Sequence, residues 1–190
     1  MIRRRALVYP KLRLTLCWTK FFSDAETQVA FVSKNGAIIG ERYADAYGAK
    51  RSGTSRSVAK SFYSAAMGVA IAEGRFTSVA EKASIVLDEF VGTDKKAITL
   101  EQKLHMRPDD FLRLGTLYAQ EGRWNGVQVI PESYVAARLN PIGSYRYQWW
   151  AMNDAYFNRA VSGDIKSAIG LHGQRILISP KHDTAIVVLG

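Results

Sequence analysis

One serine and one lysine stand three positions apart where the sequence takes on a helical pattern. Ser57 and Lys60 form a Ser-x-x-Lys motif. In the first turn of a helix, this spacing places both side chains on one face. A neutral Lys60 amine can then accept the Ser57 hydroxyl proton, while the helix N-terminus favours the charge that develops on an acyl intermediate. The spacing therefore predicts nucleophilic catalysis by Ser57, with Lys60 as its base.

A second interpretation of the same two residues needs no chemistry. Serine and lysine are common enough in this chain for one such motif to arise by chance. Ser57 would then be a helix cap, and Lys60 a solvated lysine of the first turn. The surrounding sequence has to decide between the two.

Composition excludes several other classes of protein. The 190 residues are 47% hydrophobic and 23% charged, which is typical of one soluble globular domain. Cys17 is the single cysteine, so no internal disulfide can form, and the three histidines lack the spacing of a metal site. No apolar run approaches the ~20 residues that span a bilayer. We expect neither a metalloprotein nor a membrane-spanning protein.

The net charge of +9 is concentrated at the N-terminus. Residues 1–20 contain six basic residues and no acidic residue. We therefore expect a basic, poorly ordered extension over 1–25 and a folded domain over 26–190. One alternative makes residues 1–20 a tether for nucleic acid or an anionic surface. Another is a secretory signal, but Pro10, Lys11 and Arg13 interrupt its apolar stretch, so the sequence favours the cytoplasm without settling the compartment.

Apolar periodicity and turn residues predict the elements that must position Ser57 and Lys60. Asn35-Gly36 between two apolar runs predicts a hairpin, because both residues tolerate the positive φ of a type I′ turn. Strands near both chain ends, with helices between them, predict an α+β fold with one antiparallel sheet completed by both termini. The expected strands are 29–32, 37–43, 174–178 and 184–189, the expected helices are 57–73, 108–120 and 131–139, and 145–152 is an aromatic strand or loop.

Short motifs along about two thirds of the chain point to one family. In order, they are Ile39–Ala44, Ser57–Phe62, Asp110–Gly115, Trp124–Gly126, Tyr147–Trp150, Gly170–Gln174 and Ile178–Pro180. This series resembles the serine β-lactamase-related family, which groups class C β-lactamases, penicillin-binding proteins and related esterases and amidases. Its closest resemblance is to the 6-aminohexanoate-dimer hydrolase branch. The resemblance implies an antiparallel sheet of the β-lactamase/transpeptidase type with packed helices.

The resemblance also implies roles for individual residues. Ser57 matches the nucleophile and Lys60 the base, while the backbone N–H groups of Ser57 and Leu171 match the oxyanion donors. The third family motif, Lys-Thr-Gly or His-Thr-Gly, falls on Ala168-Ile169-Gly170. Because alanine stands at 168 in place of the Lys or His, the resemblance favours a small ester or amide substrate over a penicillin. No metal or cofactor is implied. The remaining expected substrate-site residues are Gly170, Trp149, Trp150 and His172, although the tryptophans could be core residues and His172 a structural hydrogen-bonding group.

The chain also departs from the family pattern. Most of the all-helical subdomain is missing, because the sequence runs from Leu104 almost directly into the 108–120 helix. The family's tyrosine motif therefore has no counterpart in its expected place, and Tyr156 in Tyr156-Phe157-Asn158 is an out-of-order candidate. One alternative is consequently a catalytically inactive, truncated remnant. A sheet left exposed by missing helices would also favour a homodimer.

Overall fold

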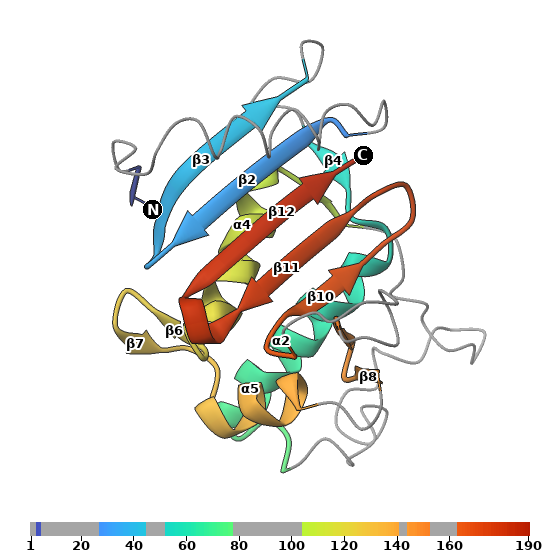
Figure 1. Cartoon of the computed structure of the whole chain (residues 1–190). Helices are drawn as coiled ribbons and strands as arrows, with labels where there is room; N and C mark the ends of the chain where they lie inside the picture. Colours follow the sequence, from blue (N-terminus) through green and yellow to red (C-terminus); the bar gives the residue numbers. More distant parts are fainter. Residues whose placement is uncertain (1–2, 5–26, 45–51, 78–103, 141–143, 153–162) are drawn as a thin grey trace, which may run out of the picture.

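An eight-stranded sheet dominates the computed structural model, which describes residues 3–4, 27–44, 52–77, 104–140, 144–152 and 163–190 (Figure 1). The strand order is β1-β3-β2-β12-β11-β10-β9-β8. Every neighbouring pair is antiparallel except β1 and β3. The strands are β1 (Arg3–Arg4), β2 (Val29–Lys34), β3 (Ala37–Tyr43), β8 (Tyr145–Arg146), β9 (Trp149–Ala151), β10 (Lys166–Ile169), β11 (Arg175–Ser179) and β12 (Thr184–Leu189).

Segments from the two ends of the chain meet at the centre of this sheet. β2 pairs with β12 over its whole length, from Val29 opposite Leu189 to Lys34 opposite Thr184. The turn between β2 and β3 uses Asn35 and Gly36, which both have positive φ, as the sequence predicts. The expected α+β fold, with an antiparallel sheet completed by segments from both ends, is therefore confirmed.

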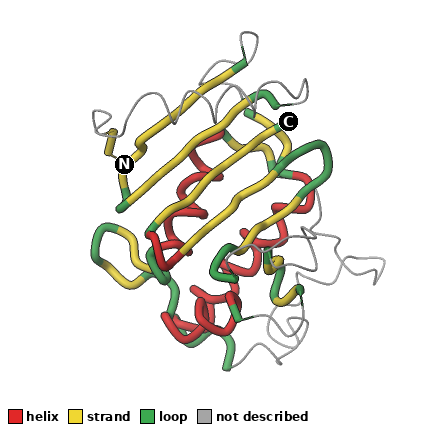
Figure 2. The backbone as a smooth tube through the Cα atoms, viewed as in Figure 1, coloured by secondary structure: helices red, strands yellow, loops and turns green. Residues whose placement is uncertain are grey.

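Helices and two small hairpins complete the described structure (Figure 2). The expected helix over 57–73 is divided, because a 3₁₀ turn comes first and the α-helix starts after Ser57. The helical elements are η1 (Arg56–Val58), α2 (Ala59–Ala72), α4 (Pro108–Ala119), α5 (Glu132–Leu139) and η3 (Pro180–His182). The small hairpins pair β4 (Gly53–Thr54) with β5 (His105–Met106), and β6 (Arg123–Trp124) with β7 (Val127–Gln128).

Helix α4 lies across one face of the central strands, behind β12 and β11 in Figure 1. Its contact with the sheet is so close that Gly115 has no room for a side chain. A Cβ there would lie 2.8 Å from Cγ2 of Ile176 and 3.0 Å from Cβ of Ala185. The core forms at this interface, because α4 and the facing strands bury their apolar side chains against each other.

Some sequence predictions fall outside the described residues. The expected basic extension lies outside the described residues, except for Arg3–Arg4, which pair with β3. Tyr156 also lies outside them. The extension, its alternatives and the role of Tyr156 remain predictions. None of the described helices has the length and apolar character needed to cross a membrane.

Candidate active site

A cavity of about 270 Å³ collects residues from three separate parts of the chain. The first is the junction of η1 and α2, the second is the hairpin of β8 and β9, and the third is the end of β10. The lining residues are Ser57, Lys60, Tyr145, Gln148, Trp150, Ile169, Gly170 and Leu171. Five of the residues singled out from the sequence therefore meet at this cavity: Ser57, Lys60, Trp150, Gly170 and Leu171.

The position of Ser57 follows from an unusual backbone turn. Arg56, immediately before it, has a φ of 50°, which a residue with a side chain adopts only at a cost in conformational energy. The chain then passes through η1 into α2, so that Ser57 and Lys60 are one turn apart and both half-buried. The structure thus brings the predicted nucleophile and base to the wall of one cavity.

Gly170 lets the end of β10 come close to this turn. A Cβ at this position would lie 3.0 Å from the Ser55 carbonyl oxygen and 3.1 Å from Cβ of Arg56. The Gly170 N–H donates to the Gln174 carbonyl oxygen at 2.8 Å, which fixes the turn that follows β10. The next residue, Leu171, lies at the cavity wall. The absence of a side chain at Gly170 therefore allows the end of β10 to pack directly against the segment that carries Ser57.

The two tryptophans of β9 face opposite sides of the hairpin. Trp150 lines the cavity, whereas Trp149 is 1% exposed and packs against Tyr118, with ring centroids 4.7 Å apart. The reason is the two-residue side-chain period of a strand. The expectation that Trp149 contributes to the cavity is therefore corrected, and Trp149 is a core residue.

His172 is also not among the residues that line the cavity. It lies exposed in the turn between β10 and β11, with a φ of 58°. Its carbonyl oxygen accepts a hydrogen bond from Nε2 of Gln174 at 3.3 Å. The structure thus gives the His172 backbone a part in shaping the turn and does not bring its side chain into the cavity lining.

Three cavity residues were not among the site residues predicted from the sequence: Tyr145, Gln148 and Ile169. Tyr145 pairs with Trp150 across the hairpin, and their ring centroids are 4.5 Å apart. The turn between them is Tyr147-Gln148, both with positive φ. Such a turn is ordinarily signalled by Asn-Gly, so the sequence held no clear marker for this hairpin.

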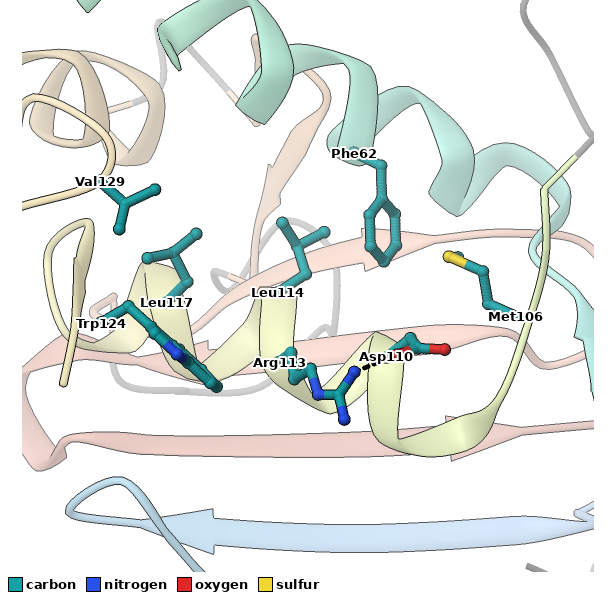
Figure 3. Close-up of a pocket in the computed structure, with 8 residues that line it drawn as sticks. All are labelled: Phe62, Met106, Asp110, Arg113, Leu114, Leu117, Trp124 and Val129. Atoms are coloured by element: carbon teal, nitrogen blue, oxygen red, sulfur yellow. Dashed lines mark hydrogen bonds and ion pairs between the residues drawn. The ribbon is translucent and has the colours of Figure 1, made fainter. Parts of the chain in front are cut away.

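A second, larger hollow lies along α4 and is shown in Figure 3. Its volume is about 830 Å³, and most of its lining is apolar. Asp110 and Arg113 lie on it but form an ion pair at 2.6 Å. The lining residues are Phe62, Met106, Asp110, Arg113, Leu114, Leu117, Trp124 and Val129. None of these described lining residues is a serine, lysine or histidine, whereas Ser57 and Lys60 line the smaller cavity.

Another tyrosine near the sheet is unsuited to chemistry for a different reason. Tyr118 is fully buried, and this burial raises the pKa of its hydroxyl to about 12, with the neighbouring Tyr134 adding to the effect. Its hydroxyl therefore stays protonated, and it lies in the core rather than in the cavity lining. Among the described residues there is also no group of three or more His, Cys, Asp or Glu that could hold a metal ion.

Sequence comparison alone does not identify relatives of this protein. No protein-family model and no curated protein matches the chain. Solved structures do match. A Bacillus anthracis protein assigned as a 6-aminohexanoate-dimer hydrolase superposes with a TM-score of 0.71 and 16% identity, over 90% of this chain and 75% of the other.

Two further solved structures have the same architecture. A Bacteroides dorei protein assigned as a β-lactamase gives a TM-score of 0.71 at 9% identity, covering 96% of this chain and 91% of its own. A Mycobacterium bovis β-lactamase superposes with a TM-score of 0.58 at 12% identity, and the match covers 85% of each chain. The chain therefore has the serine β-lactamase-related fold, and the resemblance in the motifs is matched by the architecture.

Proposed function

We propose that this protein is a serine hydrolase that cleaves a small ester or amide through an acyl-enzyme. Ser57 attacks the carbonyl carbon, and Lys60 accepts the serine proton. Water then attacks the acyl-enzyme and releases the acid. The observation that carries the proposal is that Ser57 and Lys60 line the same cavity, in a chain whose fold is that of serine β-lactamase-related hydrolases.

The surroundings of Ser57 support stabilisation of the tetrahedral intermediate. Its oxygen gains negative charge, and backbone N–H groups aimed at that position lower the barrier. We assign the two donors to the N–H groups of Ser57 and Leu171, because both residues line the cavity where Gly170 packs against Ser55 and Arg56. The start of α2 adds the positive end of a helix dipole.

The cavity also limits the substrate class. Its volume of about 270 Å³ suits a short acyl group, and Tyr145, Trp150, Ile169 and Leu171 offer apolar contacts. Lys60 is the only cation among the described lining residues, and Ala168 is buried away from the cavity. We therefore propose an uncharged ester or a short amide. The dimer named for the Bacillus anthracis protein contains an amide bond of the type proposed here.

Labelling with a fluorophosphonate tests the proposal directly. The probe forms a covalent bond to an activated serine, which intact-mass analysis detects as one adduct. We expect one adduct on the native protein and none on Ser57→Ala. Ser64→Ala is the matched control, because Ser64 lies on the same helix but does not line the cavity, so this variant should label normally.

The opposite result has an equally definite meaning. If the native protein takes no label while its thermal unfolding is cooperative, the fold is intact and Ser57 is not activated. The protein would then be an inactive, truncated remnant of the fold. A label that persists in Ser57→Ala would assign the reactive serine to another position.

A further inference from the structure

The reaction proposed above requires a proton for the leaving group. When the tetrahedral intermediate collapses, an alkoxide or amine must be protonated as its bond to carbon breaks. The family's tyrosine motif has no counterpart in its expected place in the sequence. Among the described residues that line the cavity, Lys60 and Tyr145 are the ones with an ionisable proton.

The β8–β9 hairpin determines where Tyr145 points. Tyr145 is opposite Trp150, and Arg146 is opposite Trp149. Residues that face each other across two strands share one side of the hairpin, and the next pair shares the other side. The hairpin therefore turns Tyr145 and Trp150 toward the cavity and Trp149 toward the core.

Three contacts hold this hairpin against the rest of the protein. The hydroxyl of Ser61, the residue after Lys60, is buried and donates to the Gln148 carbonyl oxygen at 2.7 Å. The Arg138 guanidinium, only 3% exposed, lies 3.6 Å from the centroid of the Tyr147 ring. Trp149 packs into the core. The first contact ties the hairpin directly to the helix that carries Lys60.

The side chain of Tyr145 is itself oriented. Its hydroxyl donates to Oε1 of Gln148, and its ring lies against Trp150. The turn that places Gln148 has φ values of 49° and 73° at two residues with side chains, a costly conformation that persists where neighbouring contacts impose it. Tyr145 remains 40% exposed and lines the cavity, so a substrate bound there can contact it.

We infer that Tyr145 is the proton donor to the leaving group, an inference that rests on the proposed serine hydrolase function. Lys60 takes the proton of Ser57 as the bond from serine oxygen to the carbonyl carbon forms. As the bond from carbon to the leaving oxygen or nitrogen breaks, that atom keeps the electron pair and takes the Tyr145 proton. The Lys60 ammonium returns a proton to the Tyr145 phenolate. The proton lost by Ser57 thus replaces the one that Tyr145 gives to the departing alcohol or amine, and the charges balance.

The test compares two esters with one acyl group and different leaving groups. p-Nitrophenolate is weakly basic and leaves without a proton, whereas ethoxide requires one. We expect Tyr145→Phe to lower kcat/KM for ethyl butyrate by about 10²–10⁴-fold, the usual contribution of general acid catalysis, and to change it for p-nitrophenyl butyrate by less than about threefold.

Tyr147→Phe is the matched control. It removes a hydroxyl from the same turn but keeps the ring on Arg138, and Tyr147 does not line the cavity. We expect native rates for both esters. Ser61→Ala should lower ethyl butyrate turnover by a smaller factor than Tyr145→Phe, because it releases the hairpin from α2 but keeps the phenol.

Several outcomes would overturn the assignment. Equal losses on both esters in Tyr145→Phe would make Tyr145 a packing residue, and no loss on either would assign the proton to another donor, such as Lys60 or Tyr156. The assignment also fails if the native protein hydrolyses p-nitrophenyl butyrate but not ethyl butyrate, because no group of the site would then protonate an alkoxide. Fluorophosphonate labelling separates these results from failure of the proposed function: fluoride leaves without a proton, so Tyr145→Phe should still label at Ser57.

Discussion

Replacing Gly170 with alanine tests whether the close approach of β10 positions the nucleophile. The new Cβ would lie 3.0 Å from the Ser55 carbonyl oxygen, 3.1 Å from Cβ of Arg56 and 3.2 Å from Cβ of Gln174. Ordinary van der Waals contact starts at about 3.4 Å. Because one of these atoms belongs to the backbone, the segment before Ser57 has to move away from β10 by a few tenths of an ångström.

The magnitude follows from the size of that shift. Overpacking of this kind costs about 1–3 kcal/mol of unfolding free energy. In catalysis, a displacement of 1 Å reduces the rate by about 10²-fold, so a smaller displacement of Ser57 from Leu171 should cost about tenfold. We therefore expect Gly170→Ala to remain folded and to react with the fluorophosphonate about ten times more slowly.

The assay combines urea unfolding with the time course of labelling, followed by intact mass. Gly163→Ala is the matched control: it precedes the same strand, and a Cβ there meets no atom of the described residues within 4 Å, so stability and labelling rate should stay native. A labelling rate within twofold of native for Gly170→Ala would refute the argument. So would an equal loss in Gly163→Ala.

Three further predictions concern stability. Gly115→Ala should lower the unfolding free energy by about 1–3 kcal/mol in urea titrations, because its Cβ would overlap Ile176; an unchanged midpoint would contradict this close packing. Tyr118 has a pKa raised to about 12, so its stabilising contribution is complete below pH 10 and is lost as the pH rises toward 12, by up to about 3 kcal/mol. Tyr118→Phe should be less sensitive to this alkaline range, and equal sensitivity would show that other groups cause it. The Ser179 hydroxyl donates to Asp164 and lowers its pKa below 3.8, so Ser179→Ala should destabilise the protein at pH 7 more than at pH 3; equal effects in urea at both pH values would exclude the linkage.

The secondary structure was largely predictable because its signals are local. Asn35-Gly36 marks the β2–β3 turn, and residues recurring at helical steps mark α2 and α4, whose ends follow the expected bounds closely. The four-residue strand β10 is too short to show a period, and it is not among the strands that the sequence predicted. The 3₁₀ turn before α2 was also not predicted, because the positive φ of Arg56 has no sequence marker.

The sequence by itself placed Ser57 and Lys60 about one helical turn apart, and the structure keeps this spacing although Ser57 lies in η1 and Lys60 in α2. The sequence did not determine which aromatic residue would join them. Trp149 and Trp150 are the same residue type, and the packing of the hairpin on the core turns Trp149 inward, whereas Trp150 and Tyr145 line the cavity that Ser57 also lines. That choice depends on contacts between segments far apart in the chain, such as the hydrogen bond from Ser61 to Gln148, which come into being only when the sheet and α2 pack together.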